Sequence, residues 1–165
     1  MTRSIEVMEV DPNVPEAKTL IAALDDYQSR LYPAESNHLD SLEELAAPNV
    51  TFVVARLNGQ VVGCGAVKAM RDAPGAPGAY GEIKRMYVAP AGRGHGLAKM
   101  MLAYLEQKLL AKDIPLARLE TGIHQAEAIG LYERLGYRRI GPFGDYREDP
   151  PSVFMEKRLD PVNGA

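Results

Sequence analysis

A glycine-rich turn between an apolar strand and a helix is the feature that most constrains the fold of this chain. The turn follows an apolar strand that ends at Pro90, and an apolar segment with helical periodicity begins directly after it. Glycine lets a backbone approach a ligand closely, and the first turn of a helix offers unpaired N–H groups and the positive end of the helix dipole. The turn therefore predicts a cradle for a pyrophosphate group. It lacks the Gly-Lys-Ser/Thr ending of a P-loop and the three-glycine dinucleotide fingerprint.

Length and charge narrow the classes of protein to which the chain can belong. Its 165 residues suit one domain, residues 1–165, and a formal net charge of −3 argues against nucleic acid as a partner. The single cysteine, Cys64, excludes an internal disulfide, and the three histidines show no metal-ligand spacing. We find no signal peptide and no apolar run of about 18 residues that would span a membrane. We therefore expect a cytoplasmic protein with no metal and no membrane partner.

Hydrophobic periodicity predicts alternating strands and helices. Apolar alternation predicts strands near 5–10, 51–56, 61–68, 82–88, 116–121, 137–140 and 152–158, and helical spacing predicts helices near 20–31, 39–45, 94–111 and 125–135. The helix 125–135 is expected to stop at Gly136. The apolar stripes expected on the first and third helices are Leu20, Ile21, Leu24, Tyr27 and Leu31, and Leu97, Met101, Leu105 and Leu109. Asn58-Gly59 predicts a tight hairpin, and the Gly, Pro and Ala residues of 71–81 predict a loop outside the core. The fold class is α+β, with a mainly antiparallel mixed sheet and one parallel βαβ step around the helix after the glycine turn.

Three motifs, in this order along the chain, resemble the Gcn5-related N-acetyltransferase (GNAT) superfamily, and two polar loops, residues 31–38 and 143–151, resemble segments of a subgroup of its small bacterial members. The three motifs are the segment 81–88 that leads into the turn, the Arg-x-x-Gly-x-Ala signature of residues 93–98, and the Ala-x-x-Leu-Tyr-x-x-x-Gly-Tyr pattern of residues 128–137. The resemblance covers about residues 50–159. It implies the GNAT fold, with a central cofactor-binding βαβ step flanked by helices, and acetyl-CoA as co-substrate.

The resemblance assigns one group of residues to acetyl-CoA. The strand backbone would pair with the pantetheine arm and offer an N–H to the thioester carbonyl, and the glycine turn would hold the pyrophosphate. Gln125 stands where the family often has asparagine, and its longer side chain leaves that contact open. The expected cofactor-binding residues are Met86, Tyr87, Val88, Arg93, Gly94, His95, Gly96, Leu97, Ala98 and Gln125.

Two side chains are candidates for catalysis. Glu82 matches the position of the general base in the Gcn5-like branch, and Tyr132 matches the tyrosine beside the CoA sulfur, where a phenol can act as general acid. Each has an alternative interpretation from the residues alone. Glu82 is then a solvated carboxylate paired with Lys84 or Arg85, and Tyr132 packs on the face of its helix.

Two polar loops are candidates for the acceptor site. The first contains Tyr32, Glu35, Asn37 and His38, and the second, which joins the last two strands, contains Tyr146. Carboxylates in these loops would attract a cationic amine, and the other polar groups would orient it. The alternative is that both loops are ordinary solvated surface.

These features predict an enzyme that transfers an acetyl group from acetyl-CoA to a primary amine of a small molecule, directly and in a ternary complex. Two alternatives stay open. One is acetylation of a protein N-terminus or lysine, and the other is a CoA-binding sensor module without turnover. A homodimer also stays open as the state of the protein.

Overall fold

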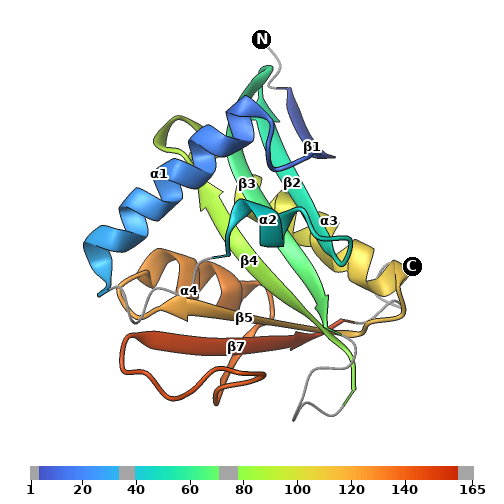
Figure 1. Ribbon diagram of the computed structural model, residues 1–165, viewed down its shortest axis with the longest axis vertical. Helices are drawn as coiled ribbons and strands as arrows, with labels where there is room; N and C mark the ends of the chain where they lie inside the picture. The colour runs from blue at the N-terminus through green and yellow to red at the C-terminus, as the bar shows by residue number, and fades with distance from the viewer. Residues whose placement is uncertain (1–3, 34–39, 71–77, 160–165) are drawn as a thin grey trace.

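The computed structural model describes residues 4–33, 40–70 and 78–159, and one mixed β-sheet forms the centre of this part of the chain (Figure 1). Its seven described strands lie in the order β1-β2-β3-β4-β5-β7-β6. They are β1 (Ile5–Glu9), β2 (Val50–Leu57), β3 (Gln60–Met70), β4 (Tyr80–Val88), β5 (Leu116–Gly122), β6 (Arg138–Ile140) and β7 (Ser152–Arg158). The helices are α1 (Pro15–Leu31), α2 (Leu42–Leu45), the 3₁₀ helix η2 (Pro90–Gly92), α3 (Leu97–Ala111) and α4 (Ala126–Arg134). Each predicted strand and helix is present, with ends that differ by a few residues.

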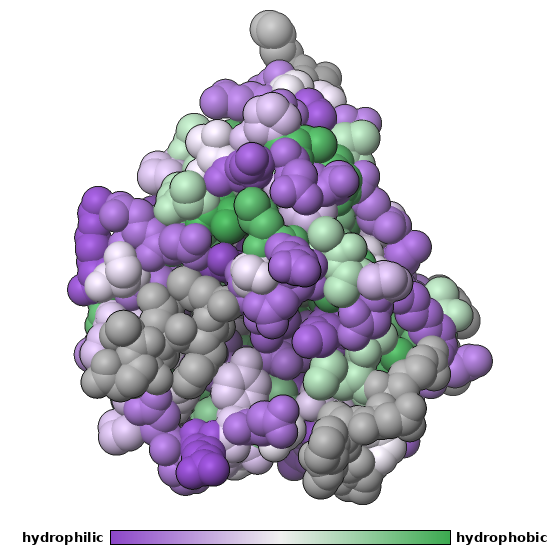
Figure 2. All heavy atoms as spheres, viewed as in Figure 1, coloured by the Kyte–Doolittle hydropathy of each residue, from purple (hydrophilic) through white to green (hydrophobic). Residues whose placement is uncertain are grey.

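Different helices cover the two faces of the sheet. On one face, Leu20 of α1 and Leu45 of α2 pack in a cluster with Phe52 of β2. On the other face, buried residues of α3 and α4, among them Met101, pack with Val53 of the same strand. Successive residues of a strand point to opposite faces, so β2 is buried on both sides because both faces are covered. On the face that carries α1 and α2, hydrophilic side chains dominate the surface and apolar ones show only in small areas between them (Figure 2).

The predicted apolar stripe of α3 is confirmed. Its residues Leu97, Met101, Leu105 and Leu109 are all at most 1% exposed. The helix begins at Leu97 rather than at residue 94, because Gly96 directly before it has a left-handed φ of +74° that cannot continue a right-handed helix. The glycines of the turn are thus outside the helix and lead into its first turn.

The parallel step of the sheet is short. All described strand pairs are antiparallel except β4 with β5, which pair in parallel over Gly81–Ile83 and Ala117–Leu119. Beyond these residues the two strands diverge (Figure 1). A bulge falls in β4 at the same place, where the register with β3 shifts and Arg85 adopts a φ of +58°. The divergence opens the sheet in its middle, and the predicted mixed sheet with one parallel βαβ step is confirmed.

Two expectations about the core are wrong. Tyr80 and Gly81, predicted in a loop, begin β4, and Tyr80 is 1% exposed in a cluster with Phe143 and Phe154. The local composition could not show that the loop before β7 folds over this end of the strand. Tyr27 falls on the predicted stripe of α1 but is 38% exposed, because the buried side of α1 ends at Leu24. No helix among the described residues is long and apolar enough to cross a membrane.

Candidate active site

The glycine turn has the backbone geometry that a phosphate cradle needs. Gly94 and Gly96 have φ angles of +83° and +74°, and the space where a Cβ would stand is open at both. In α3, which follows the turn, the first backbone N–H with a helical hydrogen bond is that of Met100, which donates to the carbonyl of Gly96 at 3.1 Å. The N–H groups before it lie at the helix N-terminus, where an anion is favoured. Arg93 holds the turn against β4 by donating from Nε to the carbonyl of Val88 at 3.1 Å.

The side chains of the expected cofactor strand are partly buried against the core. Met86 and Val88 pack on the α3 side of the sheet, and Tyr87 packs on the α1 side. A Cβ at Gly65 would overlap the Met86 sulfur, so this glycine makes room for it. Residues 86–88 can therefore serve a ligand through their backbone, and Met86 also lines the cavity between β4 and β5.

The divergence of β4 and β5 leaves a narrow cavity of about 90 Å³ between them. Its walls come from the end of α1, the middle of β4, the end of β5, and α4, with the loop before β7 on one side. Six residues predicted for the site from distant parts of the sequence line it: Tyr32, Glu82, Met86, Gln125, Tyr132 and Tyr146. A second cavity, of about 550 Å³, shares Glu82 and Tyr146 with the first.

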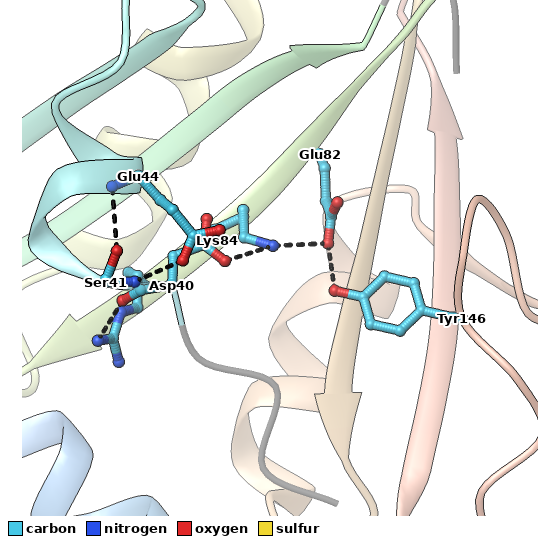
Figure 3. Close-up of polar contacts among 7 residues, drawn as sticks. Asp40, Ser41, Glu44, Glu82, Lys84 and Tyr146 are labelled. Carbon is cyan, nitrogen blue, oxygen red and sulfur yellow. Dashed lines mark hydrogen bonds and ion pairs between the residues drawn. The ribbon is translucent and has the colours of Figure 1, made fainter. Parts of the chain in front are cut away.

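Glu82 is buried in a network of charged and polar groups (Figure 3). The side chain is 8% exposed, and its Oε2 accepts hydrogen bonds from Tyr146 Oη at 2.5 Å and from Lys84 Nζ at 3.1 Å. Lys84 also pairs with Asp40 Oδ1 at 3.0 Å. Arg85 does not bind Glu82, because its guanidinium binds Asp25 Oδ1 at 2.6 Å and donates to the backbone carbonyl of Asp40 at 2.9 Å. Glu82 is therefore a buried, anchored carboxylate rather than a solvated one.

The charges of this network act on the protonation of their neighbours. Burial alone would lower the pKa of Lys84, but the carboxylates of Glu82 and Asp40 outweigh burial and raise it, so Lys84 stays a cation. Burial and the negative charge of Glu82 raise the pKa of Tyr146, so its hydroxyl stays a hydrogen-bond donor. Asp40 was missed by sequence reasoning, since no local pattern connects a residue before α2 with the middle of β4.

Tyr132 lines the same cavity from α4. Burial raises its pKa to about 12, so the phenol is protonated at neutral pH. Its ring contacts Tyr137 edge-on at 5.7 Å between centroids, and Tyr137 in turn donates to Glu106 of α3 at 2.9 Å. These contacts fix the ring of Tyr132 at the cavity wall.

Tyr32 and Gln125 close one end of the cavity together. Tyr32 Oη accepts from the backbone N–H of His124 at 3.2 Å and donates to Gln125 Oε1 at 3.4 Å. The same Gln125 oxygen accepts from the N–H of Gly122 at 3.1 Å, which leaves its NH₂ group as the end that can meet a ligand. A side chain at Gly122 would overlap the Tyr32 hydroxyl, so this close approach requires glycine.

Other expected site residues are not placed. Glu35, Asn37 and His38 lie outside the described residues, so the convergence of the two polar loops is seen here only for Tyr32 and Tyr146. Among the described residues, no group of three or more His, Cys, Asp or Glu side chains could hold a metal ion.

Comparison with known proteins connects this chain to one family. The family model described as the Acetyltransferase (GNAT) family matches residues 19–137. A protein named IAA acetyltransferase from Azospirillum brasilense is 48% identical over 140 residues, which are 85% of this chain and 88% of that protein. The N-acetyltransferase YsnE of Bacillus subtilis, whose function is uncharacterised, is 36% identical over 129 residues, covering 77% of this chain and 82% of YsnE.

Solved structures agree in fold. A crystal structure described as an acyl-CoA N-acyltransferase from Klebsiella pneumoniae has a TM-score of 0.76 and 37% identity, and the match covers 94% of this chain and 98% of that one. The PaiA N-acetyltransferase of Thermoplasma acidophilum, solved with coenzyme A, has a TM-score of 0.68 over 94% of this chain and 99% of its own. Its identity of 17% supports a shared fold alone.

Proposed function

We propose that this chain, which belongs to the acetyltransferase (GNAT) family, moves the acetyl group of acetyl-CoA directly onto the primary amine of a small molecule in a ternary complex. One observation supports the proposal most. A buried carboxylate, Glu82, and a protonated phenol, Tyr132, line the same narrow cavity where β4 and β5 diverge. Acetyl transfer to an amine needs one group that takes a proton and another that stabilises the departing sulfur.

Acetyl-CoA would bind along the backbone of β4 and the turn after it. The N–H groups around Gly94 and Gly96 would hold the pyrophosphate, and the backbone of 86–88 would pair with the pantetheine arm. The side chains of 86–88 pack in the core, and the open space above the two glycines suits a bulky anion. The thioester would then lie at the 90 Å³ cavity.

Glu82 would act as the general base. The acceptor arrives as an ammonium ion and gives one proton to Glu82, directly or through a water molecule. The neutral amine then attacks the thioester carbonyl and forms the C–N bond. Much of the rate would come from alignment of the two substrates.

Tyr132 would stabilise the departing sulfur. As the tetrahedral intermediate collapses, the C–S bond breaks and the sulfur takes the bond's electron pair. The Tyr132 hydroxyl donates a hydrogen bond to this thiolate, and the second proton of the nitrogen ends on the sulfur. A phenol with a pKa of about 12 is suited to hydrogen bonding here, because it does not ionise at neutral pH.

The two cavities support a small acceptor. The 90 Å³ cavity admits an amine and a few more atoms, and the adjoining 550 Å³ cavity can receive the rest of a polar molecule. Pockets of this kind fix orientation through a few polar groups, and Tyr32 and Tyr146 would supply them. A protein acceptor, in contrast, would insert a single side chain or terminus.

The test is release of CoA thiol from acetyl-CoA with a panel of amino acids, aminosugars, polyamines and peptides with a free N-terminus. We expect turnover with one small-amine class and a rate about 10²–10⁴-fold lower for Glu82→Gln. The dissociation constant for CoA should stay as in the wild type. Turnover with peptides alone would contradict the small-molecule acceptor, and an undiminished rate in Glu82→Gln would contradict the base.

A further inference from the structure

We propose that Lys84, backed by Asp40, is a positioning residue that sets the pH range in which Glu82 is ionised and able to accept a proton. This inference rests on the base role proposed above for Glu82. Among the described residues, the hydrogen bonds and ion pairs of Lys84 go to Glu82 and Asp40, and nothing in the chemistry of acetyl transfer requires a lysine there. Its role would be to act through Glu82.

Lys84 lies in the middle of a row of three charges (Figure 3). The side chain is 11% exposed and places Nζ 3.1 Å from Glu82 Oε2 and 3.0 Å from Asp40 Oδ1. Asp40 comes from the segment before α2, and its Oδ2 is buried without a partner. Lys84 is thus the cation that compensates both carboxylates where the two cavities adjoin.

The row leaves one oxygen of Glu82 available. Oε2 accepts from both Lys84 and Tyr146, whereas Oε1 has no hydrogen-bond partner among the described residues. Two donors on Oε2 fix the plane of the carboxylate. Oε1 is then the atom that can receive the proton of the acceptor or of a water molecule between them.

Charge balance explains why both partners are needed. A lysine alone beside a buried carboxylate stabilises the ionised form and makes the carboxylate a poor base. A second carboxylate on the other side of the lysine offsets this effect by like-charge repulsion. Removal of Lys84 and removal of Asp40 should therefore change the protonation of Glu82 in opposite directions, which a purely structural role would not do.

Other groups also face Glu82, and they stay constant in this comparison. Tyr80 lies on the same strand as Glu82, and Lys68 is the cross-strand partner of Glu82 on β3. Glu44 lies in α2, Arg118 and Glu120 lie on β5, and Asp145 and Tyr146 lie in the loop before β7. Arg118 is engaged with Glu156 of β7 at 3.2 Å. None of these side chains bridges two carboxylates at this point as Lys84 does.

The direct test is a carbon-13 NMR titration of the glutamate carboxyl signals in the full chain, with Glu82→Gln to identify the Glu82 signal. In Lys84→Met we expect the titration midpoint of Glu82 to rise by about 1–3 pH units, because an opposite charge is lost. In Asp40→Asn we expect it to fall by about 0.5–1 pH unit, because a like charge is lost. Lys84→Arg keeps the charge and should stay near the wild-type midpoint.

Two exposed residues of α1 provide matched controls. Lys18→Met and Asp26→Asn remove the same charges from the surface and should leave the midpoint unchanged. Midpoints that move in the same direction in Lys84→Met and Asp40→Asn, or that do not move in either, would overturn the inference. If Lys84→Met does not fold, the downward shift in Asp40→Asn and the retained midpoint in Lys84→Arg still decide it.

Kinetics separates this inference from the proposed function. With an amine found in the panel, the acid limb of the kcat/KM profile should move as the NMR midpoint moves in each variant. If the NMR midpoints shift in opposite directions but the acid limb stays fixed, Glu82 is not the base. The same follows if they shift but Glu82→Gln keeps the full rate. In either case the three charges have no role in catalysis. If the NMR midpoints do not shift and Glu82→Gln lowers the rate, Glu82 remains the proposed base and only the role of Lys84 is rejected.

Discussion

The glycine turn follows the end of strand β4 and the network around Glu82 lies on the strand itself, but the two are built in different ways. The turn follows Val88 and uses the backbone of consecutive residues, with Gly94 and Gly96 in conformations that other residues rarely adopt. The network uses side chains from three separate segments, and its Tyr146–Glu82 hydrogen bond joins residues 64 positions apart. One site is local backbone geometry, and the other depends on tertiary packing.

Because of this difference, the two sites should respond differently to substitution. A change in the turn alters the affinity for CoA, because the backbone there would bind the pyrophosphate directly. A change in the network alters proton transfer and acceptor binding, because its members act on one another through charge. Each prediction below tests whether the two sites can be disturbed separately.

The largest effect is expected in the turn. Gly94→Asp places a negative charge where the pyrophosphate would lie, and like-charge contact should weaken CoA binding on the order of 100-fold. Gly94→Asn is the matched control, because asparagine has the same shape and also tolerates a positive φ. Calorimetric titration with CoA measures both. Equal losses in the two variants would mean that backbone strain, and not charge, explains the effect.

The second prediction tests whether catalysis can fail while CoA still binds. Tyr132→Phe keeps the ring contact with Tyr137 and removes only the hydroxyl. We expect kcat to fall at least about tenfold and the dissociation constant for CoA to stay near its wild-type value. Single-turnover measurements confirm that the chemical step limits the rate. A normal kcat under those conditions would assign Tyr132 to packing.

The same contrast explains what the sequence could predict. The sequence predicted the glycine turn, the apolar stripe of α3 from Leu97 to Leu109 and the parallel step of the sheet. Each of these depends on residues close in the chain or on simple periodicity. The sequence also predicted that α4 ends at Gly136, and the φ of +99° at Gly136 is the left-handed conformation typical of a helix end.

The remainder depended on contacts that no local pattern shows. Lys84 appeared in the sequence only as an ordinary surface partner of Glu82, because nothing there reveals that Asp40 binds its other side. Tyr80 was expected in a loop, although the loop before β7 buries it. The bulge at Arg85 was not expected either, since a positive φ at arginine has no sequence signal.

The third prediction concerns the edge of the network that faces the acceptor. Tyr146→Phe keeps the ring contacts with Phe143 and Phe154 but removes the donor to Glu82. We expect the KM for the amine to rise about three- to tenfold, as for loss of one hydrogen bond to a charged group, with the KM for acetyl-CoA nearly unchanged. Tyr27→Phe, on the exposed side of α1, is the control. Equal changes in both KM values would show that the network and the CoA site are not separable.

The smallest effect on activity is expected at the cap of α2, which tests whether the network also depends on local structure. Ser41 lies next to Asp40 and forms a capping box, in which its Oγ accepts from the N–H of Glu44 at 3.1 Å and Glu44 Oε1 accepts from the N–H of Ser41 at 3.0 Å. Ser41→Ala should lower the free energy of unfolding by about 1 kcal/mol, measured by urea denaturation, because the helix loses its cap. Ser29→Ala, in the last turns of α1, is the matched control.

If tertiary packing holds Asp40 in place, kcat in Ser41→Ala should stay within about twofold of the wild type, since the ion pair with Lys84 and the burial of Leu45 are both kept. A loss of kcat comparable to that of Tyr132→Phe would show the opposite. The position of Asp40 would then be set by the cap, and the network would depend on local sequence as the glycine turn does.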